Sequence, residues 1–159
     1  MDSGWSGYIG VMAPLQFSPP APDAVEVRRW ALTTGAELSD LRTSLHRMLT
    51  GEALLDGEKL DEVPEQMALV ATELATNALR HGLPPTIVTL LSAEDCLVID
   101  VADHDLASVP ELADTRPVGS GGRGLLLARS FSLAVGWYAT AHTKHVWATF
   151  PRRAGRPHP

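Results

Sequence analysis

The spacing of apolar and polar residues along the chain predicts two helices. Four apolar side chains recur at intervals of three to four residues within 36–49, which predicts an amphipathic helix there. A second amphipathic helix is expected to begin at Pro64, because the first turn of a helix tolerates the missing N–H of proline. Gly82 and the prolines that follow it are expected to end that helix.

Five shorter stretches, rich in β-branched and other apolar residues, predict strands. Two neighbouring stretches are joined by three residues and the last two by a similarly short turn, so two hairpins are expected. Locally paired strands that outnumber helices favour an α/β protein of the α+β kind, a two-layer sandwich. Its sheet is expected to be mixed but largely antiparallel, with helices on one face. The predicted strands are 25–32, 86–92, 96–103, 132–140 and 144–150.

The remaining segments predict one folded domain between two irregular ends. Residues 1–24 are rich in Gly, Ser and Pro, which predicts a flexible N-terminal arm, and the basic, Pro-rich 151–159 predicts a disordered tail. The folded domain is therefore expected to span 25–150. Within it, the polar stretch 104–123 is unusually long for a loop, which predicts a functional or mobile segment, and 124–131 is expected to form a short helix.

Composition and charge narrow the classes of function. The 159 residues are 45% hydrophobic and 20% charged with a net charge of −6, which is typical of a single globular domain. The lack of a basic cluster argues against direct nucleic-acid binding, and no apolar run approaches the length of a membrane-spanning helix. A single cysteine excludes an internal disulfide, and no signal peptide is recognisable, so a cytoplasmic protein is expected.

One face of the second predicted helix carries polar side chains one turn apart. Glu73 and Asn77 stand at positions i and i+4, so they lie on neighbouring turns of one face, opposite an apolar stripe. A carboxylate such as Glu73 can accept a proton from an attacking hydroxyl. The amide oxygen of Asn77 is a hard ligand of the kind that Mg²⁺ takes. For these two residues alone, a solvated helix face is the simpler explanation.

A glycine-rich turn at 119–127 leads directly into a predicted helix. Glycines allow the backbone to approach a ligand closely, and the free N–H groups at a helix start favour anions. Arg123 adds a positive charge, so phosphate is the natural ligand of this turn, although a flexible loop ending in a helix cap fits equally well. The residues that would border the ligand are Gly119, Gly121, Gly122, Arg123, Gly124 and Leu125.

Asp103 ends a predicted strand at the point where the chain passes into the long loop. Its carboxylate can accept a hydrogen bond from an exocyclic amine such as that of adenine. Aspartate is also common where strands end, because its side chain caps turns, so turn chemistry is the alternative interpretation.

Taken in order, three motifs resemble one protein superfamily. The helix "ELATNALRHG", the strand end "VADHD" and the loop "GGRGL" are similar to the N, G1 and G2 boxes of the GHKL (Bergerat-fold) ATPases. The first motif, the longer stretch "GGRGLLLARSF" and the ending "KHVWATF" resemble the small anti-sigma-factor kinases of actinomycetes. The resemblance covers about residues 25–150.

The resemblance implies a reaction and a set of roles. It implies that ATP binds between the helices and the long loop, with Asp103 contacting the adenine amine and residues 119–125 bordering the phosphates. Asn77 would bind Mg²⁺, and Glu73 would be the general base for transfer of the γ-phosphoryl group. The implied acceptor is a serine or threonine of a STAS-type anti-anti-sigma partner, and a sigma factor is the second implied partner. Members of this family usually form dimers, so a homodimer is implied as well.

The sequence departs from the family pattern in the G1 box. Asp105 and Ala107 stand where the family usually has glycines, which places side chains and a negative charge near the nucleotide. The alternative function is therefore a non-catalytic regulator that sequesters a protein partner and binds nucleotide weakly or not at all. Arg42 lies near the position of a partner-binding helix arginine in these kinases, with a solvated helix face as the alternative, and Lys144 is expected to face solvent.

Overall fold

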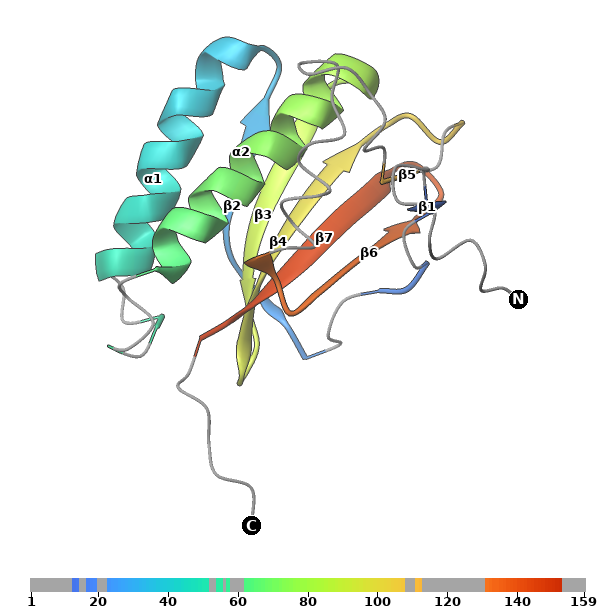
Figure 1. The fold of residues 1–159 in the computed structure, drawn as a ribbon. Helices are drawn as coiled ribbons and strands as arrows, with labels where there is room; N and C mark the ends of the chain where they lie inside the picture. The colour runs from blue at the N-terminus through green and yellow to red at the C-terminus, as the bar shows by residue number, and fades with distance from the viewer. Residues whose placement is uncertain are drawn as a thin grey trace.

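The structure, a computed structural model of the chain, is a two-layer α+β sandwich in which two helices cover one face of an antiparallel sheet (Figure 1). This architecture confirms the predicted fold class. No described helix combines the length and the apolar composition that crossing a membrane would require. The structure describes residues 13–14, 17–19, 23–51, 54–55, 57, 62–107, 111–112 and 131–152.

The central sheet has five described strands in the order β2–β3–β4–β7–β6, and each neighbouring pair is antiparallel. β3 and β4 have the bounds that the sequence predicts, and they form the first expected hairpin. β6 and β7 form the second hairpin. Two further strands, β1 (Ala13–Pro14) and β5 (Glu111–Leu112), pair with each other. The central strands are β2 (Val25–Leu32), β3 (Thr86–Ser92), β4 (Cys96–Asp103), β6 (Ala134–Ala139) and β7 (Lys144–Pro151).

Helix α1 (Leu38–Gly51) begins two residues later than predicted, because a short 3₁₀ turn, Gly35–Glu37, precedes it. The carboxylate of Glu37 accepts hydrogen bonds from the backbone N–H groups of Thr33 and Thr34, at 2.7 and 3.0 Å. These two bonds lower the pKa of Glu37. They also satisfy backbone donors that the start of a helix would otherwise leave open, which explains where the helical segment begins.

Helix α2 (Val63–His81) has a proline in its first turn and is closed by Gly82, as the sequence predicts. One face of α2 is buried against α1 and against strands β3, β4 and β7. Burying a large apolar side chain stabilises the fold by about 2 kcal/mol, so this shared core fixes α2 over the centre of the sheet. The fully buried large side chains include Leu41, Leu45, Met67, Val88, Ile99 and Phe150.

Part of the segment predicted to be an arm contacts the edge of the sheet. The ring of Phe17 meets Trp137 of β6 edge to face, with ring centroids 4.8 Å apart, and the two residues form a parallel β-bridge. The backbone carbonyl of Ser18 accepts a hydrogen bond from the indole N–H of Trp147 at 2.7 Å. Both tryptophans therefore pack within the protein. The flexibility of residues 1–24 stays a prediction, because most of that segment lies outside the described residues.

Several other predicted segments lie largely outside the described residues. Of the long loop 104–123, the structure describes 104–107 and the two residues of β5. Of the predicted helix 124–131, it describes Phe131 alone, and of the predicted tail it describes 151–152. The expectations for the rest of these segments therefore stay predictions.

Candidate functional site

The end of helix α2 and the end of strand β4 are in direct contact. The backbone N–H of Gly82 donates to the carbonyl of Ala78 at 2.8 Å and closes α2. A Cβ atom on Gly82 would lie 2.5 Å from both Cγ and Oδ2 of Asp103, so the helix end rests on this carboxylate. The N–H of His104 donates to the carbonyl of Leu83 at 3.0 Å and joins the two chain segments. The structure thus brings together the helix motif and the strand-end motif.

Asp103 is a buried carboxylate whose two oxygens have different surroundings. The side chain is 7% exposed. Oδ1 accepts a hydrogen bond from the backbone N–H of Asp105 at 2.7 Å, which is the turn chemistry that the sequence offered as one interpretation. Oδ2 lies 3.8 Å from Nζ of Lys144, farther than a direct hydrogen bond allows. The turn chemistry of Asp103 is thus confirmed, and the contact with an adenine amine stays a prediction, for which the turn leaves the oxygen that faces Lys144.

The prediction that Lys144 faces solvent is wrong. Antiparallel pairing aligns Asp103 of β4 with Lys144 of β7, and directly paired residues place their side chains on the same face of a sheet. That face is the one that α2 covers, so the lysine side chain is 9% exposed. Thr86 of β3 extends this row on the other side of Asp103. The pairing of Ile87 with Ala102 places Thr86 opposite Asp103. Its hydroxyl is buried and has no hydrogen-bond partner in the described part of the chain.

Glu73 and Asn77 stand on α2, one turn apart, and both side chains are partly buried. Leu74 and Ala75 beside them belong to the buried face, so the core fixes the orientation of the polar pair. Within the described residues, the side-chain carboxylate of Glu73 makes no hydrogen bond or ion pair. At 1.5 Å of rise per residue, Asn77 lies about 8 Å and Glu73 about 14 Å along the helix from Gly82. Asp103 therefore lies at the C-terminal end of the helix that bears both residues.

The glycine-rich turn at 119–127 lies outside the described residues, so its position relative to Glu73, Asn77 and Asp103 is not described. The phosphate contacts predicted for it stay predictions. The residues concerned are Gly119, Gly121, Gly122, Arg123, Gly124 and Leu125.

The residues that replace the G1-box glycines form a tight acidic turn. Besides donating to Asp103, Asp105 accepts a hydrogen bond from the N–H of Ala107 through its carboxylate, at 3.0 Å. Two successive side-chain caps of this kind hold the backbone where family members usually have flexible glycines. The turn therefore adds a carboxylate next to the candidate site.

Magnesium is the metal that the candidate residues fit. In the described part of the chain, no three His, Cys, Asp or Glu side chains gather into a metal site. Mg²⁺ does not need such a cage, because it keeps several waters and is often held by one protein oxygen together with substrate phosphates. The amide oxygen of Asn77 is suited to this role.

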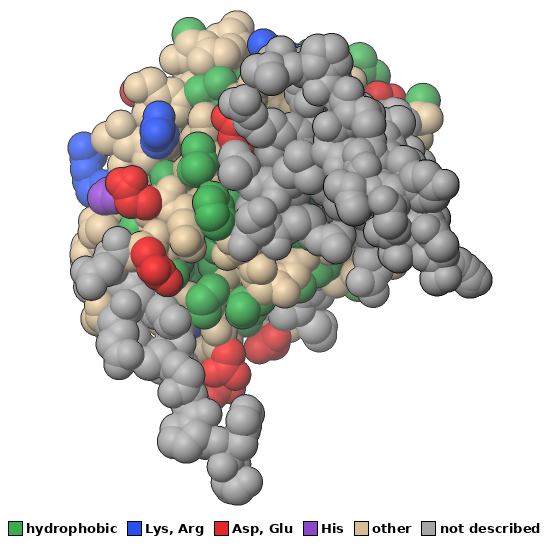
Figure 2. Space-filling view, viewed as in Figure 1, with side chains coloured by type: hydrophobic (Ala, Val, Ile, Leu, Met, Phe, Trp, Pro, Cys, Tyr) green, Lys and Arg blue, Asp and Glu red, His purple; other side chains and the backbone are tan. Residues whose placement is uncertain are grey.

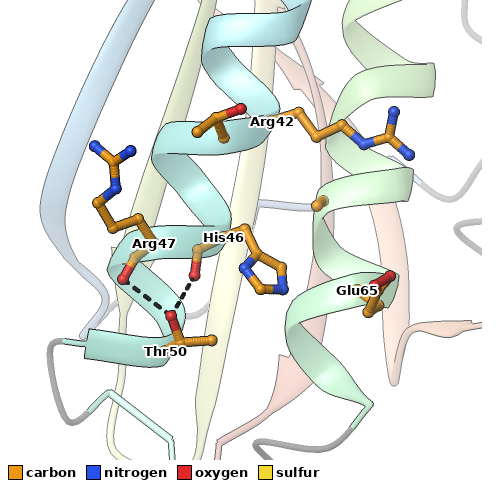
Figure 3. Close-up of a pocket in the computed structure, with 7 residues that line it drawn as sticks. Arg42, His46, Arg47, Thr50 and Glu65 are labelled. Atoms are coloured by element: carbon orange, nitrogen blue, oxygen red, sulfur yellow. Dashed lines mark hydrogen bonds between the residues drawn. The ribbon is translucent and has the colours of Figure 1, made fainter.

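A separate open cleft of about 530 Å³ runs between α1 and α2. Arg42, His46 and Arg47 of α1 and Glu65 of α2 line it. In Figure 3, Arg42 and His46 extend from α1 towards α2, whereas Arg47 points away on the other side of its helix. Figure 2 shows basic, histidine and acidic side chains grouped on the helix layer. The side chains that line the cleft are therefore largely polar and charged, unlike the apolar side chains of the core.

Sequence reasoning missed two groups of polar residues. The first is Lys144, whose approach to Asp103 depends on which strand pairs with β4. The second is a hydrogen-bonded cluster on the face of the sheet opposite α1 and α2, centred on Asp100 and His145. The signal for the second was an aspartate in the middle of an otherwise apolar strand, which requires a polar partner if it is buried.

Comparison with known proteins gives a family match. The family model described as the histidine kinase-like ATPase domain matches residues 32–150, from the last residue of β2 almost to the end of β7. This range contains the helix motif, the strand end and the glycine-rich turn. No curated protein matched the chain.

Proposed function

We propose that this chain, which belongs to the histidine kinase-like ATPase domain family of the GHKL type, is a serine/threonine protein kinase. ATP binding is implied by the family itself. The proposed acceptor is a serine or threonine of a STAS-type anti-anti-sigma protein, and the proposed second partner is a sigma factor. Regulation of transcription in the cytoplasm is the role that follows from these partners.

The observation that carries the proposal is the contact between Gly82 and Asp103. It places a buried carboxylate at the end of the helix that bears Glu73 and Asn77. An oxygen of Asp103 at this point can accept a hydrogen bond from the adenine amine, while Lys144 offers positive charge on the same face. The phosphates would then extend along α2 towards Asn77 and Glu73.

The proposed roles of the chain's residues follow from that order. Asn77 would hold Mg²⁺, which supplies charge neutralisation at the phosphates when it is bound. Glu73 would accept the proton of the acceptor hydroxyl. The hydroxyl oxygen would bond to the γ-phosphorus as the bond from that phosphorus to ADP breaks. Glu73 suits this role because no other group of the described residues binds its carboxylate.

The cleft between α1 and α2 is the proposed partner surface. Arg42 and His46 lie on its α1 side, on a chain whose net charge is −6. The guanidinium of Arg42 on this side favours an acidic segment of a partner, and Glu65 on the α2 side favours a basic group beside it. A homodimer is the proposed assembly, on the strength of the family resemblance.

A second candidate function is a non-catalytic regulator that sequesters its partner. The acidic turn favours it, because the carboxylate of Asp105 next to the site opposes the negative charge of a polyphosphate. The two candidates agree on the partner surface and differ on phosphoryl transfer.

Transfer of the γ-phosphate separates the two candidates. The purified chain would be mixed with STAS-domain proteins of the same organism and with Mg·ATP labelled in the γ-phosphate. The kinase proposal predicts label on a serine or threonine of one STAS protein, and loss of that label with Asn77→Ala. The variant Gln66→Ala is the matched control, since it truncates another amide on α2 that lies far from Gly82. A stable complex with a STAS protein or sigma factor that never acquires label would favour the second candidate.

A further inference from the structure

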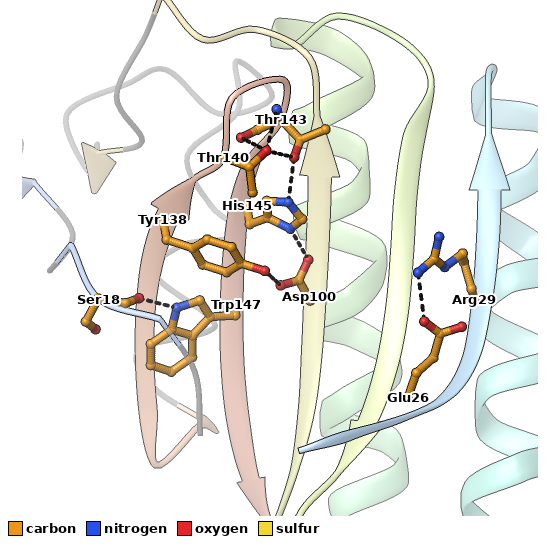
Figure 4. Close-up of polar contacts among 9 residues, drawn as sticks. All are labelled: Ser18, Glu26, Arg29, Asp100, Tyr138, Thr140, Thr143, His145 and Trp147. Carbon is orange, nitrogen blue, oxygen red and sulfur yellow. Dashed lines mark hydrogen bonds and ion pairs between the residues drawn. The ribbon is translucent and has the colours of Figure 1, made fainter. Parts of the chain in front are cut away.

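A chain of hydrogen bonds lies on the face of the sheet opposite α1 and α2 (Figure 4). Nδ1 of His145 lies 2.7 Å from Oδ1 of Asp100, and Nε2 of the same ring lies 2.8 Å from Oγ1 of Thr143. The phenol of Tyr138 donates to the other oxygen of Asp100 at 3.1 Å. A hydroxyl, an imidazole and a carboxylate therefore stand in series, with Thr143 at the outer end.

The neighbouring groups fix the direction of the protons in this series. The hydroxyl oxygen of Thr140 accepts from the backbone N–H groups of His142 and Thr143, at 3.2 and 3.0 Å. Its own proton is directed to Oγ1 of Thr143 at 2.7 Å. The proton of Thr143 is then directed to Nε2 of His145, and the other ring nitrogen donates to Asp100. This assignment of the tautomer follows from the network.

The surroundings hold the imidazole rigidly and leave the hydroxyl accessible. The ring of Tyr138 stacks on His145 with centroids 4.4 Å apart and planes within 7°. The side chain of Asp100 is 7% exposed. Burial, followed by the charge of Asp100, raises the pKa of Tyr138, so the phenol stays a donor. Thr143 itself is partly exposed in the turn before β7.

A hydroxyl bonded to an imidazole that a buried carboxylate orients is the arrangement that activates an oxygen nucleophile. We propose that Thr143 is a covalent acceptor of a phosphoryl group, with His145 as its base and Asp100 as the residue that orients His145. Neither the family match nor the candidate ATP site assigns a role to these three residues. The site is thus a modification site separate from the Asp103 region.

Phosphoryl transfer fits this turn better than acyl transfer does. Acyl transfer needs free N–H donors for an oxyanion, whereas the N–H groups of His142 and Thr143 both donate to Thr140. In phosphoryl transfer, the proton that His145 accepts remains opposite the new phosphate. The product is therefore a phosphothreonine beside an imidazolium that Asp100 stabilises.

The step is balanced with a nucleoside triphosphate as donor. Oγ1 of Thr143 bonds to the γ-phosphorus, the bond from that phosphorus to the leaving diphosphate breaks, and the hydroxyl proton passes to Nε2 of His145. Lys144 faces Asp103 on the helix side, and the adjacent Thr143 and His145 meet on the other side of the sheet. Transfer would therefore run from one copy of the chain to another, and this donor rests on the proposed kinase function.

The test is to map phosphate on the chain after incubation with Mg·ATP over a range of protein concentrations. Phosphate on Thr143, at a rate that rises with protein concentration, is expected. His145→Gln should slow the labelling by about 100-fold, as loss of a general base does. Thr143→Ser should keep the label and Thr143→Val should abolish it. Thr149→Val is the matched control and should keep the label, because it removes another hydroxyl of β7, one that donates to the carbonyl of Ala134 outside this network.

A protein that binds ATP but carries no phosphate on Thr143, or a His145→Gln variant labelled as fast as wild type, would overturn the proposal. If titration shows no ATP binding, the proposed function fails first, and a fluorophosphonate probe then tests the nucleophile directly. Attack by Oγ1 on the phosphorus of the probe expels fluoride. Labelling of Thr143 that depends on His145 would uphold the activated hydroxyl, and no labelling would refute it.

Discussion

Gly82 and Asp103 lie so close that a Cβ atom on the glycine would stand 2.5 Å from the carboxylate carbon. The φ angle of Gly82 is −96°, which any residue adopts, so the contact and not the backbone conformation requires glycine here. This contact joins the helix motif to the strand-end motif. In the proposed function, it would therefore link the stability of the α2–β4 junction to nucleotide binding.

Replacing Gly82 by alanine should weaken nucleotide binding and destabilise the fold. The new methyl group must displace the Asp103 carboxylate or the end of α2, and overpacking of this kind costs about 1–3 kcal/mol. We expect a lower midpoint of urea unfolding and about 10-fold weaker ATP binding, equivalent to about 1.4 kcal/mol. Gly51→Ala is the control, since a Cβ there meets no atom within 4 Å. Equal effects of the two substitutions would contradict the role of the contact.

The buried pair of Asp103 and Lys144 should show strong coupling. Removing one partner leaves the other charge buried without this ion pair, which costs about 3 kcal/mol. Asp103→Asn and Lys144→Met should each lower the free energy of unfolding by about that amount, and the double variant should lose less than the sum. Urea unfolding of the four proteins measures the coupling. Additive losses would show that the 3.8 Å separation carries no interaction.

Glu73→Gln separates binding from chemistry. The amide keeps the shape of the side chain but cannot accept a proton, so ATP affinity should change by less than about 3-fold while phosphoryl transfer falls by about 100-fold or more. Calorimetry and γ-phosphate transfer, measured on the same preparations, give the two quantities. A variant that transfers phosphate at the wild-type rate would remove Glu73 from the proposed mechanism.

The raised pKa of Tyr138 predicts how the free energy of unfolding depends on pH in the alkaline range. Burial and Asp100 raise the pKa of its phenol in the folded protein, so the neutral form is favoured there. Its contribution is fully present below the ordinary tyrosine pKa of about 10 and is lost as the pH rises above it. Between about pH 8 and about pH 11, wild type should lose more stability than Tyr138→Phe does. Parallel losses in the two proteins would contradict the assigned pKa shift.

Local patterns predicted the parts of the fold whose causes are local. The strands β3 and β4 are rich in β-branched and other apolar residues and end at turn residues, and their bounds agree with the prediction. The start of α1 was misplaced by two residues, because the carboxylate of Glu37 caps an additional 3₁₀ turn before it. Such a cap depends on side-chain geometry that periodicity does not report.

The polar contacts between distant strands could not be predicted from the sequence in the same way. Lys144 meets Asp103, and His145 meets Asp100, because β7 pairs with β4 in one register. A shift of one residue would exchange the two faces and send Lys144 to the other side. The order of strands thus decides which residues form the candidate site and which form the cluster around His145.

Calorimetric titration of ATP and ADP, with and without Mg²⁺, into wild type and Asn77→Ala tests the central claim most directly. The site built on α2 and the end of β4 predicts ATP binding that depends on Mg²⁺ and that weakens in the variant. No heat of binding for the wild type at about millimolar nucleotide, equivalent to less than about 4 kcal/mol of affinity, would contradict it.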